Sequence, residues 1–152
     1  MRDVAGFTDG SALGNPGSCG GGYVIYHKGE VVTEEWIALG MGDNNLGEMA
    51  ALLAIFQRLI LLFEAGDFQK GIRCLVFSDS AGCIGYLDRG CKSPTTKKLS
   101  RDTRSALTAL RKITKTLLYW IRGHVDIPGN EKADKKAREG ANKSKEDLEV
   151  AG

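Results

Sequence analysis

Four carboxylates occur where strands and helices could bring them together, namely Asp9, Glu48, Asp79 and Asp134. Asp9 lies inside an apolar stretch, although strands disfavour aspartate and an unpaired buried charge is costly. Carboxylate oxygens are the hard ligands that Mg²⁺ and Mn²⁺ prefer, and bound ions would offset the repulsion between crowded acids. Two such ions about 3.5–4 Å apart form a clamp for phosphodiester displacement.

Three of these acids also have an ordinary structural explanation inside or beside their own element. Asp9 could be a strand-end residue whose oxygens accept backbone hydrogen bonds. Glu48 follows Asn45 at the capping-box spacing, so it could simply cap the start of a helix. Asp79 ends an apolar stretch before a helix and could be the N-cap residue. The carboxyl end of a central strand is, however, also where open α/β sheets bind ligands.

Two further residues have both a functional and a structural interpretation. Asp134 could be the surface partner of Arg138, one helical turn later. His124 is the kind of lone histidine that usually serves a surface or structural role. Beside a carboxylate cluster it could shuttle protons or assist product release, because its reference pKa of about 6.5 suits that work.

The elements that would position these residues alternate between strands and helices. The patterns predict strands over 4–12, 20–28, 30–40, 72–80 and 117–123, with a tight hairpin at 27–29. They predict helices over 45–64, 80–90, 96–115 and 128–143. Hairpin-linked strands followed by strand–helix alternation indicate an α/β fold, a mixed sheet with helices on its faces. We expect a catalytic domain over 1–143 and a flexible tail over 144–152.

Composition excludes several classes of protein. At 152 residues the chain should form one domain. The longest apolar run, 59–63, is too short to span a bilayer, and no signal-peptide pattern is present, so we expect no membrane association. The cysteines form no CxxC pair, which argues against zinc or a disulfide framework. Reduced thiols predict an intracellular, reducing compartment, the cytoplasm or nucleus.

The small net charge of +2 hides a basic segment. Residues 1–88 carry five basic and eleven acidic side chains, whereas residues 89–122 carry ten basic side chains and one acid. One interpretation is a solvated helix face. The other is an electrostatic footprint for a polyanion. Charge alone does not separate the two.

Four blocks of the sequence resemble ribonuclease H of type one, the family of the cellular enzymes and of the ribonuclease H domains of reverse transcriptases. They are "FTDGSALGNPGSCGGGYVIY", "NNLGEMAALLAI", "VFSDS" and "WIRGHVDIPGNEKADKKA", and they cover about residues 5–140 in the family's order. The resemblance implies a ribonuclease H-like fold, a five-stranded mixed sheet flanked by helices on both faces. It also implies cleavage within the RNA strand of RNA–DNA hybrids, leaving 5′-phosphate and 3′-hydroxyl ends.

The resemblance carries residue roles with it. Two Mg²⁺ ions, with Mn²⁺ able to substitute, would be held by Asp9, Glu48, Asp79 and Asp134, and His124 would assist turnover. The family contacts the RNA strand's 2′-hydroxyls, which distinguish RNA from DNA, through its first glycine loop and polar residues before the first helix. The matching residues here are Gly10, Ser11, Asn15, Asn44 and Asn45. Glu131 matches a family position near the metal site.

The chain also departs from the family's pattern. The long basic handle of the cellular bacterial members looks absent or shrunken, with Lys92, Lys97, Lys98 and Arg101 as a partial substitute. Because phosphate contacts provide most non-specific binding, this weakens the expected affinity for substrate. Asp43 replaces the usual Thr or Ser, where an acid would repel phosphate but could cap the helix.

Two other functions remain open at this stage. One is a non-catalytic nucleic-acid-binding or connector module of a reverse-transcriptase polyprotein, although such modules usually lose an acid and none is missing. The other is a related nuclease with a different nucleic-acid substrate, which would predict loss of the glycine loop and the Asn pair. We expect an RNA–DNA hybrid as the partner and a monomer, and an origin excised from or fused to a reverse transcriptase stays open.

Overall fold

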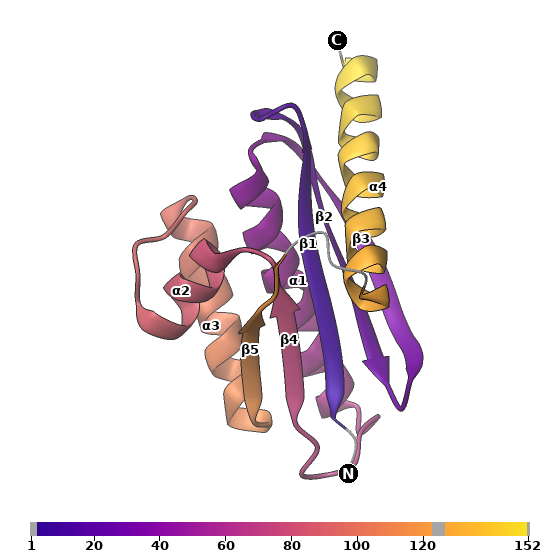
Figure 1. Ribbon diagram of the computed structural model, residues 1–152, viewed down its shortest axis with the longest axis vertical. Coiled ribbons are helices and arrows are strands. Elements are labelled where there is room, and N and C mark those ends of the chain that lie inside the picture. The colour runs from indigo at the N-terminus through magenta and orange to yellow at the C-terminus, as the bar shows by residue number, and fades with distance from the viewer. Residues whose placement is uncertain (1–2, 123–126, 152) are drawn as a thin grey trace.

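The computed structural model of the protein describes residues 3–122 and 127–151, and within them it contains a five-stranded mixed sheet (Figure 1). The strands are β1 (Val4–Leu13), β2 (Gly17–His27), β3 (Glu30–Gly42), β4 (Cys74–Ser78) and β5 (Thr116–Trp120). The helices are α1 (Asn44–Glu64), α2 (Ala81–Arg89), α3 (Lys97–Ile113) and α4 (Pro128–Ala151). The α/β fold and the mixed sheet that the sequence predicts are confirmed.

The strand order is β3-β2-β1-β4-β5, so β1 is the central strand. It pairs antiparallel with β2 and parallel with β4. The β2–β3 hairpin turns at Lys28 and Gly29, whose φ angles of 54° and 78° both lie in the left-handed region. This is the backbone of the two-residue turns that match the twist of antiparallel strands, and it confirms the predicted hairpin.

Helices α1 and α4 pack on opposite faces of the sheet (Figure 1), and a run of glycines in β2 determines how closely they approach. A Cβ atom added at Gly20 or Gly22 would lie 2.2 Å or 2.4 Å from a backbone nitrogen of α4. On the alternate face, a Cβ at Gly21 would lie 3.0 Å from a carbonyl oxygen of α1. Residues 20–22 therefore serve helix–sheet packing within the fold, a role that the sequence interpretation did not assign to them.

Helix α1 supplies much of the hydrophobic core. Its fully buried side chains include Met49, Leu52, Ile55, Phe56 and Leu59. Within the described part of the chain, α1 is the one helix long and apolar enough to cross a membrane, with a mean hydropathy of 1.8 over its most apolar window. Half of that window is buried inside the fold against the sheet and α3, and this packing accounts for its apolar character.

The C-terminal helix is longer than the one predicted over 128–143, because α4 continues to Ala151. Ser144 is buried. Its hydroxyl donates to the Cys19 carbonyl and accepts from the amides of Leu39 and Gly40. These bonds tie the helix to the β3 edge. The predicted helix end at residue 143 is therefore too early, since a single buried hydroxyl holds the next turns and gives no signal in the periodicity.

Candidate active site

Three carboxylates meet at the carboxyl ends of two central parallel strands. Asp9 lies inside β1, one residue beyond the last β1–β4 pair, Asp79 directly follows β4, and Glu48 lies in the second turn of α1. One oxygen from each of the three lies within 4.8 Å of the others. Asp9 and Glu48 are buried and Asp79 is half-buried. The sheet and the first helix therefore bring these three predicted site residues together.

The absence of a side chain at Gly10 allows α1 to start beside Asp9. A Cβ atom at Gly10 would lie 2.4 Å from the backbone nitrogen of Glu48. The helix is capped by Asp43, whose Oδ1 accepts from the Leu46 amide at 2.9 Å. The capping box predicted as one alternative for Asn45 and Glu48 is therefore wrong, while the suggested capping by Asp43 is confirmed. The Glu48 carboxylate turns inward toward the sheet.

The segment after β4 also resolves an alternative left open by the sequence. Ser80 caps α2, because its hydroxyl accepts from the Cys83 amide at 3.1 Å. The N-cap interpretation of Asp79 is therefore wrong. Instead, the Asp79 carbonyl accepts a hydrogen bond from the indole N–H of Trp120, on β5, at 3.0 Å. Sequence reasoning missed Trp120, although its place at the exposed end of the strand beside β4 was a signal.

Burial and mutual repulsion change the acidity of the cluster. Burial, and next the charge of Asp79, raises the pKa of Asp9 to about 7. Burial, followed by the charges of Asp9 and Asp79, raises the pKa of Glu48 well above its usual value. The Glu48 Oε2 atom is buried and has no hydrogen-bond partner within residues 3–122 and 127–151.

These observations test whether the residues suit a metal ion. A divalent cation would give the orphaned Glu48 oxygen a partner and would favour the ionised form of all three acids. The donors are oxygens alone, with no cysteine or histidine in this group, which suits hard ions such as Mg²⁺ or Mn²⁺. The cluster therefore fits a divalent metal.

Asp134 lies near this group but is not one of its three members. It extends from α4 into the same hollow, of about 360 Å³, which is lined by Asp9, Gly10, Asn44, Asn45, Glu48, Asp79, Ser80 and Asp134. Its Oδ2 accepts from Arg138 at 2.9 Å, so the predicted surface pair is also present. The structure thus supports both interpretations of Asp134.

The candidate substrate-binding residues divide into two groups. Gly10, Asn44 and Asn45 line the carboxylate hollow, and the Asn44 amide donates to the Asn15 side-chain oxygen at 3.2 Å. Ser11, the next residue of β1, and Glu131, exposed in the first turn of α4, are not among the residues that line it. His124 lies outside the described residues.

The basic candidates lie apart from the carboxylates. Lys97 and Arg101 line a hollow of about 320 Å³ between α2 and α3, together with Lys92 and Arg104. Lys98 is exposed and pairs with Asp102 at 3.0 Å. The structure thus gathers four of the ten basic side chains of residues 89–122 around this hollow, which with Lys98 form the basic surface, and none of them lines the carboxylate hollow.

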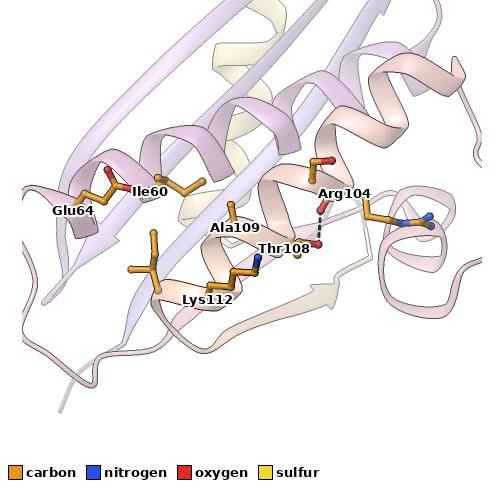
Figure 2. A pocket seen from close by; sticks show the side chains of 8 residues that line it. Ile60, Glu64, Arg104, Thr108, Ala109 and Lys112 are labelled. Carbon is orange, nitrogen blue, oxygen red and sulfur yellow. Dashed lines mark hydrogen bonds between the residues drawn. The ribbon is translucent and has the colours of Figure 1, made fainter.

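A further hollow, of about 530 Å³, lies between α1 and α3 (Figure 2). Glu64 is the one carboxylate among its lining residues, and α3 contributes Arg104 and Lys112 to the same lining. This hollow lacks the grouped oxygen ligands of the carboxylate site, so it is not a candidate for the same chemistry.

Clustered carboxylates at the ends of central strands suit a metal-dependent enzyme, and comparison with known proteins identifies the family. The family model described as RNase H matches residues 1–142. A ribonuclease H from Agrobacterium fabrum is 32% identical over 149 residues, covering 92% of this chain and 95% of that protein. One from Psychromonas ingrahamii is 30% identical over an alignment that covers all of both chains.

Solved structures agree with this fold. The N-terminal RNase H domain of a Mycobacterium tuberculosis protein superposes with a TM-score of 0.76 at 23% identity, covering 97% of this chain and 99% of that one. LC11-RNase H1, solved in complex with an RNA/DNA hybrid, gives 0.73 at 21% identity, with coverage of 93% and 99%. The chain belongs to the ribonuclease H family. It is accordingly a nuclease, an enzyme of the hydrolase class.

Proposed function

We propose that the protein is an endoribonuclease that hydrolyses the RNA strand of RNA–DNA hybrids with two bound divalent ions. Cleavage would leave 5′-phosphate and 3′-hydroxyl ends. The observation that carries this proposal is the group of Asp9, Glu48 and Asp79, whose oxygens lie within 4.8 Å of one another and include an orphaned buried atom. Relatives named ribonuclease H, and a similar structure solved with an RNA/DNA hybrid, support the choice of substrate.

Asp9, Glu48, Asp79 and Asp134 would hold the ions, with Mg²⁺ the natural choice and Mn²⁺ able to substitute. When bound, the ions activate a water and stabilise the leaving oxygen. Buried Asp9 and Glu48 would be fixed contributors to this site. Asp134 is 46% exposed and already paired with Arg138, so its carboxylate would have to leave that pair to bind an ion and would be the less rigidly held ligand.

Substrate recognition would come from the polar wall of the same hollow. Asn44 and Asn45 lie at the start of α1, and Asn15 is tied to Asn44 by a hydrogen bond. Amide side chains and the nearby backbone of Gly10 and Ser11 can both donate and accept hydrogen bonds, as recognition of a 2′-hydroxyl requires. Glu131, exposed in the first turn of α4, would contact the substrate beside this wall.

The remaining roles extend the same proposal. His124 would move a proton or assist product release beside the carboxylates. Lys97, Lys98 and Arg101 would contact phosphates of the hybrid outside the hollow. The protein would work as a monomer in an intracellular, reducing compartment, either alone or derived from a reverse transcriptase.

The test is cleavage of labelled RNA–DNA hybrid, duplex RNA and duplex DNA, each incubated with Mg²⁺, with Mn²⁺ or with EDTA. We expect cleavage of the hybrid alone, dependent on metal, with every product extendable from a 3′-hydroxyl. An Asp79→Asn variant of unchanged fold serves as the matched control for contaminating nuclease. Survival of the hybrid at ample enzyme in both metals would refute the proposed activity.

A further inference from the structure

The backbones that carry Asp9 and Asp79 are held in different ways. Asp9 lies within the ladder of the central strand, where it pairs with Gly22 of β2. The pairing of β4 with its neighbours ends at Ser78, so Asp79 lies one residue beyond the last ladder pair on both sides. A metal ligand at that position needs another source of rigidity, because a ligand must be fixed to bind well.

The end of β5 supplies that rigidity. The Ile121 amide donates to the Ser78 carbonyl at 2.9 Å, and the Trp120 indole Nε1–H donates to the Asp79 carbonyl at 3.0 Å. On the far side, the Ser80 amide donates to the Ser78 hydroxyl at 3.1 Å. The peptide units on both sides of the Asp79 side chain are therefore restrained, and the bond from the indole is the one that acts on Asp79 itself.

Burial does not account for a tryptophan at this position. The Trp120 side chain is 52% exposed, so its ring gains little from core packing. The adjacent Tyr119 behaves differently, because its ring stacks on Phe77 with centroids 5.3 Å apart on the opposite face of the strand. What Trp120 contributes to the described structure is a directed N–H donor on a rigid, bulky side chain.

We propose that Trp120 is a positioning residue of the carboxylate site. Its indole N–H fixes the Asp79 carbonyl and thereby keeps the Asp79 carboxylate against Asp9 and Glu48. The inference rests on the proposed function in one respect, namely that Asp79 holds a metal ion. Loss of a hydrogen bond to a ligating side chain commonly weakens metal affinity by about 10–100-fold, and we expect a bond to the ligand's backbone to act at the low end of that range.

The experiment removes the N–H and leaves the ring. The indole of Trp120 is replaced by its benzothiophene isostere through site-specific incorporation, and Trp120→Phe is made in parallel. Tyr119→Phe and Trp36→Phe are matched aromatic controls outside the hydrogen bond. Mn²⁺ binding to the protein without nucleic acid is measured by calorimetry, and kcat and KM for hybrid cleavage are measured at several Mn²⁺ concentrations.

We expect the isostere to bind Mn²⁺ about tenfold more weakly, with kcat lowered about tenfold at fixed low Mn²⁺ and largely restored by excess. KM for the hybrid should change less than about twofold, and the melting temperature should stay within about 3 °C of the parent, because the ring remains. Both controls should match the parent protein. Rescue by excess Mn²⁺ is a result that a general packing defect would not give.

Three outcomes would overturn the inference: parental Mn²⁺ affinity in the isostere, a change in KM alone, or a parent protein that binds no Mn²⁺ in an Asp79-dependent way. A change in KM alone would instead assign the exposed ring to substrate contact. If the parent binds Mn²⁺ through Asp79 but leaves the hybrid intact, the proposed activity fails, and weaker Mn²⁺ binding by the isostere still supports Trp120 as a positioning residue.

Discussion

Two of the three clustered acids are buried and the third is half-buried, whereas the cations of the basic surface extend into water. Asp9 and Glu48 are 7% and 8% exposed, but the Lys98 side chain is 87% exposed. Buried like charges repel strongly and change each other's acidity, while exposed charges are screened by salt within about 10 Å. The carboxylate cluster can therefore bind metal ions for catalysis, and the basic surface can add affinity for the substrate through many weak contacts.

The largest effect should follow removal of one acid from the buried cluster. We expect Asp9→Asn or Asp79→Asn to lower the single-turnover cleavage rate by at least about 10³-fold, because each change removes a charged ligand that no neighbour can replace. The rate is measured at saturating hybrid, so that binding does not contribute. A parental rate in either variant would remove that residue from the metal site, provided that circular dichroism shows an unchanged fold.

The same substitution should have the opposite effect on stability in EDTA. With the pKa of Asp9 raised from 3.8 to about 7, the folded state binds a proton more tightly than the unfolded state. Stability from this group is complete below about pH 4 and is lost as pH rises toward 7. Because each pKa unit is worth about 1.4 kcal/mol, Asp9→Asn should stabilise the metal-free protein at pH 8 by about 2 kcal/mol, with about 4 kcal/mol as the upper bound.

Urea unfolding in EDTA at pH 5 and pH 8 measures this effect. The parent should lose stability between the two values, and Asp9→Asn should lose less. Saturating Mg²⁺ should restore the parent at pH 8 but should restore Asp9→Asn much less. A parent protein that becomes more stable from pH 5 to pH 8 in EDTA would contradict the raised pKa values of Asp9 and Glu48.

An intermediate effect is expected at Asp134, which shares features of both regions. It lines the carboxylate hollow but is 46% exposed and paired with Arg138. We expect Asp134→Asn to lower the cleavage rate by about 10–100-fold, less than loss of a clustered acid. Arg138→Gln is the matched control, since exposed pairs contribute little and its rate should stay within about twofold. A loss equal to that of Asp9→Asn would place Asp134 with the buried group.

The contrast between the two regions also explains what the sequence could reveal. Asp9 was conspicuous because a charge interrupts an apolar strand, and the hairpin at 27–29 was conspicuous because its turn chemistry is local. Glu48 and Asp79 became convincing through the family resemblance, since capping explained each of them alone. The actual caps lie close by, Asp43 five residues before Glu48 and Ser80 directly after Asp79, so local propensity could not distinguish them.

Other features depended on contacts between segments distant in the chain. Ser144 holds the last turns of α4 to β3 across more than 100 residues, and Trp120 reaches Asp79 across 41 residues. Neither contact alters the periodicity of its own element. Helix boundaries and positioning residues were therefore missed where a single long-range hydrogen bond decides the outcome.

The smallest effect on rate should come from the basic surface. We expect Gln substitutions at Lys97, Lys98 and Arg101 together to raise KM for the hybrid by about tenfold in low salt and to leave the single-turnover rate at saturation unchanged. Each lost phosphate contact lowers the magnitude of the salt slope of binding by about 0.9. Because Asp102 already pairs with Lys98 in the parent, Lys98 should count as less than a full contact, and we expect a total decrease of about 2.

The matched control is a second triple variant, which removes three cations at the opposite end of the sheet. Lys28 lies in the β2–β3 turn, and Lys70 and Lys115 precede β4 and β5, far along the strands from the carboxylates. Gln at these three positions changes the net charge equally and should alter the salt slope little. Equal losses in the two triple variants would show that overall charge, rather than a located surface, attracts the hybrid, and the basic segment would then be an ordinary solvated face.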